Sequence, residues 1–399
     1  MSRRTHGIAR RMADIEPFHV MALLARAREL EACGRDIVHL EIGEPDFPTP
    51  GPVVRAGIEA LERGELFYTP ALGLPALREA ISAYYRSRYG ADVAPSRILV
   101  TTGSSAALLL ACAALVDPGD EVLLADPGYP ANRQFVRVVE GVPRSVPVHA
   151  ASGYQLAPGH LEGHWGPRTV AALVASPSNP TGTLVSGERL SAMAEFVRGK
   201  GGTLIVDEIY HGLVYEGETT TAAALADDVV VINSFSKYFS MTGWRLGWLV
   251  APENLVGEFD RLAQNLYLAA PTPAQLAAIA AFRPETLAIL DARAREFKAR
   301  RDYLVPALRG LGFEIPVMPQ GAFYIYAGCG KLTDDSFAFA RDLLEEAGVA
   351  ITPGIDFGAN APERHVRFAY TRPIERLKEG VSRIAKFLDG PRAAAERLS

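Results

Sequence analysis

A lysine stands in an unusual setting in the second half of the chain. Lys237 follows residues 228–233, a short apolar and β-branched run that predicts a buried strand, and small and hydroxyl-bearing residues surround it. Lysine side chains normally lie on solvated surfaces. An amine at the end of a buried strand is suited instead to form a Schiff base with a carbonyl group, so Lys237 is the first candidate for chemistry.

Groups that bind phosphate flank this lysine. Ser234 precedes it, and Arg245 follows it after a Thr-Gly-Trp turn. Hydroxyls and a planar guanidinium can bind one phosphate together while the lysine reaches an aldehyde. The string S-x-S-K-x-x-x-x-x-G-x-R resembles the lysine signature of the class I/II aminotransferases, enzymes of fold type I that use pyridoxal 5′-phosphate.

Other polar side chains follow the ends of predicted strands. Apolar runs alternate with helical patterns, and this order predicts an α/β fold with a mostly parallel sheet and helices on both faces. Ligands bind outside the carboxyl ends of such strands. The predicted strands cover residues 98–102, 120–125, 169–175, 202–206 and 228–233, and the candidates after them are Ser104, Ser105, Tyr129, Asn179, Asp207 and Tyr210.

Ser104 and Ser105 stand before a helix predicted over residues 107–115, beyond a tight turn at 103–106. The free amides and positive dipole end of a helix N-terminus form an anion site, so these serines are predicted to bind the cofactor phosphate. Taken alone, Ser104 is better explained as a simple helix cap, and the other motifs of the set favour phosphate binding instead.

The remaining candidates match the needs of a flat cofactor ring. Tyr129 can stack on the ring, and Asn179 and Tyr210 can share its phenolate oxygen. Asp207 can pair with the ring nitrogen and keep it protonated, which makes the ring an electron sink. Each residue alone also fits an ordinary place in a turn, a loop or a cap.

Two motifs outside the predicted sheet point to the substrate carboxylate. The segment EIGEPDF brings bare backbone at Gly43 close to another group, and HVRFAY places Arg367 in an apolar strand, where a guanidinium needs an anion. Both segments resemble aminotransferase motifs, as do PQGAFY and PGIDFG, and the resemblance implies that Gly43, Asn179 and Arg367 bind the substrate. A plain turn and a solvent-facing arginine are the alternatives.

Tyr68 is predicted to act in a neighbouring subunit. By pattern it is an aromatic residue in a loop, but the spacing Y-x-x-x-x-G-x-x-x-L-R is similar to the family segment whose tyrosine reaches the phosphate of the adjacent active site. The resemblance therefore implies a homodimer with shared active sites.

The resemblance also implies the domain plan. A large cofactor domain with a mostly parallel seven-stranded sheet is expected over residues 50–285, and a smaller α+β domain combines an N-terminal arm and segment, 1–49, with residues 286–399. Within the smaller domain, helical patterns cover 18–30, 285–304 and 335–347, and strand patterns cover 36–42, 313–317, 321–326, 349–354 and 366–370.

Composition excludes several other classes. The 399 residues are 48% hydrophobic and 22% charged with a net charge of −5, which indicates an ordinary globular protein without a nucleic-acid footprint. No apolar run has the length of a membrane span, and three scattered cysteines favour a reducing cytoplasm. His160 and His164 are read as solvated residues of a glycine-rich loop, so no metal site is expected.

The sequence thus predicts an aminotransferase that moves the amino group of an L-amino acid to a 2-oxo acid, such as 2-oxoglutarate, by a ping-pong mechanism. Lys237 is its Schiff-base lysine and proton carrier. Ser105 occupies the place of a lysine in aspartate-specific members, so aspartate, alanine and neutral or aromatic donors all stay open. Residues 15–21, Arg133 and Tyr324 are expected around the substrate side chain.

Two alternatives use the same residues. A β-eliminating C–S lyase, or a related non-transaminating enzyme, needs the same protonated ring and differs in the pocket that decides the fate of the carbanion. A regulatory protein built on an aminotransferase-like domain would need no turnover at all.

Overall fold

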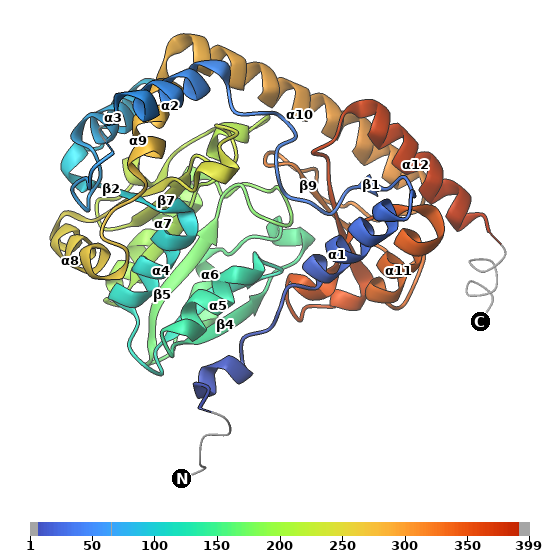
Figure 1. Ribbon diagram of the computed structural model, residues 1–399. Helices are drawn as coiled ribbons and strands as arrows, with labels where there is room; N and C mark the ends of the chain where they lie inside the picture. The colour runs from blue at the N-terminus through green and yellow to red at the C-terminus, as the bar shows by residue number, and fades with distance from the viewer. Residues whose placement is uncertain (1–6, 65, 391–399) are drawn as a thin grey trace.

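A single mixed sheet dominates the structure, a computed structural model that describes residues 7–64 and 66–390 (Figure 1). Within these residues, seven strands pair in the order β2-β8-β7-β6-β5-β3-β4. Strand β8 is antiparallel to both neighbours, and the others share one direction, so the predicted mostly parallel sheet is confirmed. The strands are β2 (Ile98–Thr101), β3 (Glu121–Asp126), β4 (Val142–Pro147), β5 (Thr169–Ala175), β6 (Thr203–Asp207), β7 (Val230–Ser234) and β8 (Gly247–Val250).

Five of these strands lie where the apolar runs predicted them, and two were not recognised individually. Strand β4 is an edge strand whose residues are mostly accessible, and its sequence VPRSVP contains two prolines and an arginine. Strand β8 has only four residues and follows the Lys237 segment directly. Strand β4 lacks the continuous apolar run that marks a buried parallel strand, whereas β8 is apolar and buried but very short.

Helices cover both faces of the sheet, and alternate strand residues supply two apolar layers (Figure 1). Ile205 and Ile232 face one layer with α4, α5 and α8, while Val206 and Val231 face the other with α3, α6 and α7. Burial on both faces explains why these strands are apolar throughout. The helices on this side of the molecule are α2 (Gly51–Arg63), α3 (Pro75–Tyr89), α4 (Gly103–Leu115), α5 (Pro130–Val138), α6 (Pro158–His164), α7 (Gly187–Gly199), α8 (Val256–Leu266) and α9 (Thr272–Ile279).

The start of α4 corrects one prediction. The helix begins at Gly103, so the turn expected at residues 103–106 is its first turn. Thr102 occupies the N-cap position and no side chain caps this end, so Ser104 is not the helix cap. A second correction concerns the His160–His164 segment, which forms the short helix α6 instead of a glycine-rich loop.

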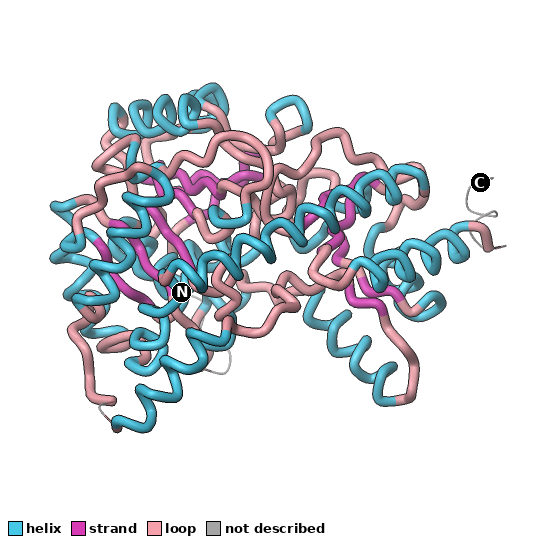
Figure 2. The backbone as a smooth tube through the Cα atoms, turned by 90° about the horizontal axis from the view of Figure 1, so that it is seen from above, coloured by secondary structure: helices cyan, strands magenta, loops and turns pink. Residues whose placement is uncertain are grey.

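A smaller body of helices and short strands packs beside the large sheet (Figure 2). Strands β11, β12 and β9 form an antiparallel sheet, and β1 pairs in parallel with β10. Its elements are α1 (His19–Ala32), β1 (Val38–His39), α10 (Pro284–Gly310), β9 (Tyr324–Gly328), α11 (Ser336–Asp342), a π-helical turn (Leu343–Ala347), β10 (Val349–Ala350), β11 (Thr352–Pro353), β12 (His365–Ala369) and α12 (Ile374–Leu388).

Two predicted strands here are shorter or absent. The strand expected over residues 36–42 reduces to β1, and the segment 313–317 makes only a single bridge from Glu314 to Gly328. Pro316 lies in that segment and cannot donate to a ladder, which limits its pairing. Strand β1, from the N-terminal segment, pairs with β10 from the C-terminal part of the chain. The division into 1–49, 50–285 and 286–399 stays a prediction. Its two ends, residues 1–6 and 391–399, lie outside the described residues.

The long helix α10 connects the two parts and anchors the loop after β1 (Figure 1). Arg300 donates to Asp46 at 2.8 Å, and Arg293 donates to the carbonyl oxygen of Pro48 at 2.7 Å. The ring of Phe47 packs edge-on against Phe297 with ring centroids 5.3 Å apart. The position of the GEPDF loop is therefore set by the middle of α10. No helix in the described part of the chain is long and apolar enough to cross a membrane.

We predict that Arg300→Gln lowers the free energy of unfolding by about 3 kcal/mol, because it leaves Asp46 without its partner in a mostly buried position. The two side chains of this pair are 3% and 11% exposed. Lys298→Gln on the same helix is the control, since its pair with Asp302 is 39% and 41% exposed and contributes less than about 1 kcal/mol. Urea unfolding measures both, and equal losses would contradict the prediction.

Candidate active site

A cavity of about 500 Å³ lies at the carboxyl ends of the large-sheet strands and is closed by segments from both ends of the chain. Its wall brings together most of the predicted residues from eight separate segments, and Tyr68 and Ser234 are the predicted cofactor-binding residues that it does not include. The predicted residues on the wall are Gly43, Ser104, Ser105, Tyr129, Asn179, Asp207, Tyr210, Lys237, Arg245, Tyr324 and Arg367.

Lys237 extends into this cavity from the end of β7. Its Nζ donates to the carbonyl oxygen of Gly43 at 2.7 Å. Burial lowers the pKa of Lys237 to about 8, an effect that Glu44 opposes and that the charges of Arg367 and Arg245 reinforce. A lysine with this pKa holds a substantial uncharged fraction near neutral pH, which is the form that attacks a carbonyl and accepts a proton.

Gly43 has no room for a side chain. A Cβ built on it would lie 2.0 Å from the hydroxyl oxygen of Tyr324, which itself lies 2.9 Å from the hydroxyl oxygen of Tyr210. The expectation that bare backbone at Gly43 approaches another group is therefore met. The polar contact that the structure shows is made by the carbonyl oxygen of Gly43, and a role of its amide in substrate binding stays a prediction.

Asp207 ends β6 and is 3% exposed. Its Oδ1 accepts the backbone N–H of Ile209 at 3.1 Å. Burial raises the pKa of Asp207 to about 7, although that hydrogen bond and Lys237 both act in the opposite direction. A carboxyl group withdrawn from water with so few partners is suited to pair with a cationic ring nitrogen.

An anion site lies where the start of α4 meets Arg245. A Cβ on Gly103 would lie 2.6 Å from Nη2 of Arg245, and one on Gly247 would lie 2.7 Å from the backbone nitrogen of Ser104. These glycines let the guanidinium and the helix N-terminus approach closely. Arg245 adopts a left-handed conformation with φ 53°, and its Nη1 donates to the carbonyl oxygen of Thr242 at 3.0 Å. Free helix amides, hydroxyls and a guanidinium together fit a phosphate.

Ser234 lies behind this wall. Its Oγ accepts the backbone N–H of Ser236 at 3.0 Å and donates to the carbonyl oxygen of Leu246 at 3.4 Å, and the side chain is buried. The wall includes Ser236 instead, the other hydroxyl of the S-x-S-K string. The structure therefore contradicts Ser234 as a wall residue and indicates that it orders the turn before Lys237.

Arg367 is buried on β12, which contradicts the alternative of a solvent-facing arginine. It donates to Oδ1 of Asn179 at 3.0 Å, to the carbonyl oxygen of Glu41 at 2.6 Å and to Oγ1 of Thr352 at 3.1 Å. Its guanidinium carbon lies 4.4 Å from the ring centroid of Tyr324. Its Nε has no hydrogen-bond partner among the described residues, so the group is held in place by neutral acceptors and still has a donor for an anion.

The residues predicted to contact the cofactor ring make hydrogen bonds to other side chains in the structure. Asn179 contacts Arg367, and Tyr210 contacts Tyr324, so the predicted sharing of one oxygen by Asn179 and Tyr210 stays a prediction. Tyr129 stands at the N-terminus of α5 on the cavity wall, and burial raises its pKa to about 12. It is therefore a neutral, flat side chain at neutral pH.

Tyr68 is 85% exposed and away from the cavity. Of the predicted side-chain pocket, residues 18, 20 and 21 and Tyr324 line the wall, while Arg133 donates to the carbonyl oxygen of Asp356 at 2.9 Å and stays outside it. The sequence reasoning assigned no role to several other wall residues, among them Leu24, Leu108, Ile209, Thr242 and Thr352. It quoted the motifs EIGEPDF and PGIDFG but gave no role to Glu41, Asp356 or Phe357 within them.

The family model for aminotransferase class I and II matches residues 35–384 of this chain. The chain belongs to this family. Relatives match most of its length. The chain is 38% identical to the (5-formylfuran-3-yl)methyl phosphate transaminase of Methanocaldococcus jannaschii, over 96% of this chain and all of that protein. It is 39% identical to the valine–pyruvate aminotransferase of Mycobacterium tuberculosis, over 94% of this chain and 97% of that protein.

Solved structures agree with the sequence relatives. The crystal structure of an aminotransferase from Mycobacterium tuberculosis superposes with a TM-score of 0.93 at 39% identity, over 96% of this aminotransferase and 100% of that chain. The predicted α/β fold of type I is therefore correct, and the regulatory alternative gives way to an aminotransferase.

Pyridoxal 5′-phosphate is the cofactor of this family, and the residues of the cavity fit it. The anion site beside Gly103 suits its phosphate, the buried carboxyl of Asp207 suits its ring nitrogen, and the amine of Lys237 suits its aldehyde. Among the described residues no group of His, Cys, Asp or Glu side chains is arranged to hold a metal ion.

We predict that Gly43→Ala displaces either Tyr324 or the loop that carries the carbonyl partner of Lys237. The cost of such overpacking is about 1–3 kcal/mol, and kcat/KM should fall with it. Tyr324→Phe removes the hydroxyl oxygen that the new Cβ would meet at 2.0 Å, so the double variant should recover part of the stability lost. Additive losses in a double-mutant cycle would contradict the proposed contact.

Asp207→Asn gives a second prediction. In the cofactor-free protein Asp207 stays protonated up to its raised pKa of about 7, while the unfolded chain ionises from its ordinary value of 3.8. The folded state therefore holds more protons between these values, and its stability falls as the pH rises through them. At pH 8 the variant should be more stable than the wild type, on the order of 3 kcal/mol, and yet inactive.

The measurement is thermal and urea unfolding of both cofactor-free proteins between about pH 4 and 8, a range that spans the two pKa values. Asp228→Asn is the control, because Asp228 lies in a solvent-accessible ion pair with Arg198 that lowers its pKa, so the linkage has the opposite sign. If Asp207→Asn is less stable than the wild type at every pH, the carboxyl group of Asp207 stabilises the cofactor-free protein and the prediction is contradicted.

Proposed function

We propose that this aminotransferase transfers the amino group of a neutral L-amino acid to a 2-oxo acid by a ping-pong mechanism. The observation that carries the proposal is one cavity that holds both the Lys237 amine and the free Nε of Arg367. An amine for the aldehyde and a guanidinium for a carboxylate are the two fixed contacts that any 2-amino acid needs.

Arg367 is proposed to bind the carboxylate of both substrates. Asn179, Glu41 and Thr352 hold its guanidinium through neutral oxygens, so its positive charge is not cancelled before substrate arrives. The contact with the face of Tyr324 fixes the plane of the group. An incoming carboxylate therefore meets a pre-oriented cation.

Lys237 is proposed to carry the proton. Its lowered pKa, about 8, leaves part of the amine uncharged at neutral pH once it is released from the cofactor. From the end of β7 it reaches over to Gly43, so the amine is held on the substrate side of the cavity. A base and conjugate acid with a pKa near the working pH suits the removal of a proton from Cα and its return to an adjacent carbon.

The bound cofactor would supply an electron sink that makes the Cα proton acidic. Asp207 would hold its ring nitrogen, Tyr129 would cover a ring face, and Ser104, Ser105 and Arg245 would hold its phosphate. Asn179 and Tyr210 are proposed near the ring oxygen. In this arrangement each end of the cofactor is fixed by a different strand end of the large sheet.

The remaining wall favours a neutral substrate side chain. Phe18, Val20, Met21, Leu24 and Leu108 supply apolar surface on it. The basic residues on the described wall are Lys237, Arg245 and Arg367, and each already has a proposed partner. A second carboxylate, as in aspartate, would therefore be buried without a dedicated cation. The relative from Mycobacterium tuberculosis is named for valine and pyruvate, which agrees with this preference.

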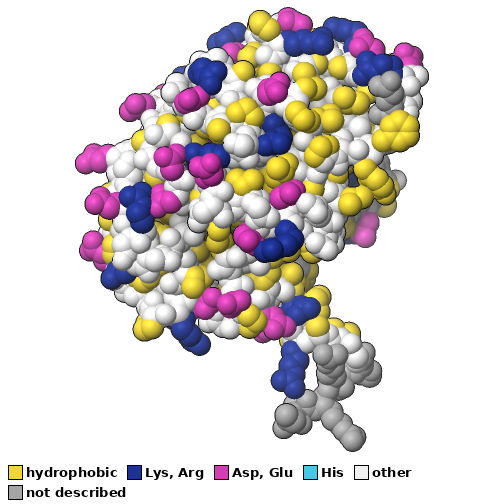
Figure 3. All heavy atoms as spheres, turned by 90° about the vertical axis from the view of Figure 1, so that its left-hand side faces the viewer, with side chains coloured by type: hydrophobic (Ala, Val, Ile, Leu, Met, Phe, Trp, Pro, Cys, Tyr) yellow, Lys and Arg dark blue, Asp and Glu magenta, His cyan; other side chains and the backbone are white. Residues whose placement is uncertain are grey.

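A homodimer is proposed from the exposed residues near Tyr68. Phe67 and Tyr68 are 77% and 85% exposed, and Ile58 and Leu61 on the neighbouring helix α2 are 49% and 58% exposed. Figure 3 shows hydrophobic side chains gathered on part of the face that carries α2, α3 and α8. Large exposed aromatic side chains beside apolar helix positions are typical of a subunit interface, and Tyr68 would reach the phosphate site of the partner.

The test of the proposal is a single-turnover spectrum of the holoenzyme. Alanine, valine, phenylalanine, cysteine, aspartate and glutamate are mixed with it separately, without an acceptor. Neutral donors should convert the cofactor to its pyridoxamine form at least about tenfold faster than aspartate. Because both substrates of a ping-pong mechanism use one cavity, pyruvate should return the cofactor faster than 2-oxoglutarate.

Two outcomes would change the proposal. A faster reaction with aspartate would refute the preference for neutral donors, and release of ammonia and pyruvate from cysteine, with the cofactor spectrum unchanged, would establish the C–S lyase instead. Lys237→Ala should still bind the cofactor but lose at least about a thousandfold in rate. Lys331→Ala, at a side chain 71% exposed on the surface, is its control and should react normally.

A further inference from the structure

A buried glutamate lies next to the substrate arginine, and none of the chemistry described above uses its side chain. Glu41 is fully buried, and its backbone carbonyl oxygen accepts hydrogen bonds from Nη2 of Arg367 at 2.6 Å and from Oγ1 of Thr352 at 3.2 Å. Its Oε1 lies 2.7 Å from Nδ1 of His39, and its Oε2 has no partner among the described residues. A carboxylate at such a depth needs a positive partner.

His39 is the only basic side chain that the described residues place in hydrogen-bond contact with this carboxylate. Its second nitrogen, Nε2, lies 3.0 Å from Oε1 of Glu31 on α1. A neutral imidazole carries one N–H and can donate to one carboxylate, whereas the protonated ring donates to both. The pairing of both ring nitrogens with carboxylates therefore favours imidazolium, and the bond to Glu41 and the charge of Glu31 raise the pKa of His39.

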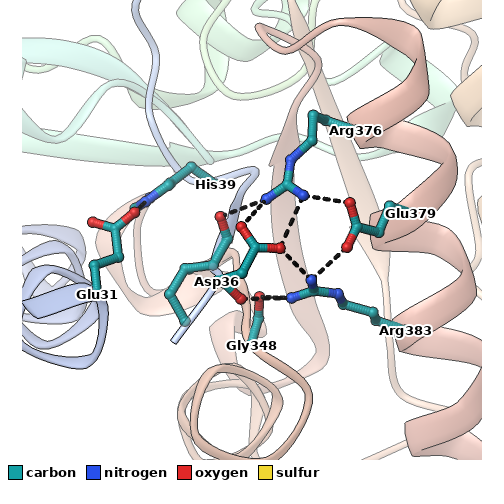
Figure 4. A network of polar contacts seen from close by, with 8 residues as sticks. Glu31, Asp36, His39, Gly348, Arg376, Glu379 and Arg383 are labelled. Atoms are coloured by element: carbon teal, nitrogen blue, oxygen red, sulfur yellow. Dashed lines mark hydrogen bonds and ion pairs between the residues drawn. The ribbon is translucent and has the colours of Figure 1, made fainter. Parts of the chain in front are cut away.

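These three residues connect the active-site cavity to a hollow on the outside of the molecule. Glu41 lies on the cavity wall, and Glu31 and His39 line the hollow, which has a volume of about 550 Å³. Leu24 and Ile42 line both spaces and separate them. Figure 4 shows His39 and Glu31 on the side of Asp36 that faces away from α12.

Backbone hydrogen bonds fix the position of the segment that carries His39 and Glu41. Val38 and His39 pair with Val349 and Ala350 of β10, and the next residue, Leu40, accepts the backbone N–H of Ala369 at 2.6 Å. A shift of the His39–Glu41 side-chain pair is therefore transmitted to the Glu41 carbonyl oxygen. That oxygen makes the shortest of the hydrogen bonds described for Arg367.

We propose that His39 and Glu41 are positioning residues for substrate carboxylate binding: an imidazolium held between Glu31 and Glu41 fixes the carbonyl oxygen that orients Arg367. The proposal rests on the proposed role of Arg367 and adds to it a control by protonation from the outer hollow. It requires no contact between His39 and the substrate.

The direction of the pH dependence follows from the raised pKa of His39. The imidazolium contacts are fully present below the ordinary pKa of histidine and are lost as the pH rises through the raised value. Carboxylates should therefore bind more weakly above that value. The charged groups around the ring are Glu31 and Arg28 from α1, Asp36 and Glu41 from its own segment, and Arg372 and Arg376 at and before the start of α12. Asp36 is already paired with Arg376 and Arg383 (Figure 4).

The experiment measures carboxylate binding without turnover. The probes are butyrate and 3-phenylpropionate, which carry a carboxylate and no amino group. Their dissociation constants for the holoenzyme are taken from the change in the cofactor spectrum and from calorimetry. The measurements run from about pH 6 to 9, the range in which His39 should titrate. Proton NMR of the imidazole rings, assigned with His39→Gln, gives the pKa of His39 directly.

In the wild type the dissociation constants should rise as His39 loses its proton. In His39→Gln and Glu41→Gln they should be about tenfold higher at low pH, the scale of one weakened hydrogen bond to a charged group, and should lose this pH step. Cofactor affinity should not change, because no residue of the anion site or Asp207 contacts these side chains. Asp36→Asn is the matched control, since it loosens the same segment from α12 without removing a hydrogen-bond partner of His39 and should keep the pH step.

The proposal is wrong if both glutamine variants bind the probes as the wild type does at every pH. It is also wrong if cofactor affinity falls together with carboxylate affinity, since that result would mean a general loss of structure. Failure of the proposed transamination would appear separately, as a wild-type holoenzyme that binds the carboxylates but converts no donor.

Discussion

Three ionisable side chains are withdrawn from water into one cavity, and the rest of the structure depends on keeping them there. Lys237, Asp207 and Arg367 each have fewer charged partners than their burial calls for: a carbonyl oxygen for the lysine, an N–H for the aspartate and three neutral oxygens for the arginine. The lowered pKa of Lys237 and the raised pKa of Asp207 both have burial as their first cause. Such groups persist only where a stable framework holds them.

The large sheet provides that framework. Its strands are buried on both faces, so their ends are fixed in position and the side chains just beyond them converge at one edge. Asp207 and Lys237 come from neighbouring strands, β6 and β7, and the first turn of α4 lies against β8. The acceptors of Arg367 come from three other segments: the loop after β5, the segment after β1, and strand β11.

The N-terminal segment has a larger part in the site than its length suggests. It supplies Gly43, whose carbonyl oxygen meets Lys237, and Glu41, whose carbonyl oxygen meets Arg367. It is held from outside by β10, by the Asp36 ion pairs with α12 and by α10, which anchors the loop after Gly43. Figure 4 shows how several of these outer contacts gather around Asp36. The substrate side of the cavity is thus set by contacts that lie outside it.

The sequence by itself determined the family, the parallel sheet, the cofactor and the set of polar residues at the strand ends. Those features are local: an apolar run marks a strand buried on both faces, and a motif such as S-x-S-K-x-x-x-x-x-G-x-R keeps its residue types in fixed spacing. The five strands that carried this pattern were found. The proline-containing edge strand β4 lacked it, and the apolar strand β8 has only four residues.

Only the tertiary structure decided which neighbours these residues have. The contact between Lys237 and Gly43 joins positions 194 residues apart, and that between Arg367 and Glu41 joins positions 326 apart. It also placed Ser234 behind the cavity wall that Ser236 lines, paired Tyr210 with Tyr324 and placed Glu41 beside the substrate arginine. Local pattern carries no information about such pairs, because they form only when distant segments pack together and exclude water.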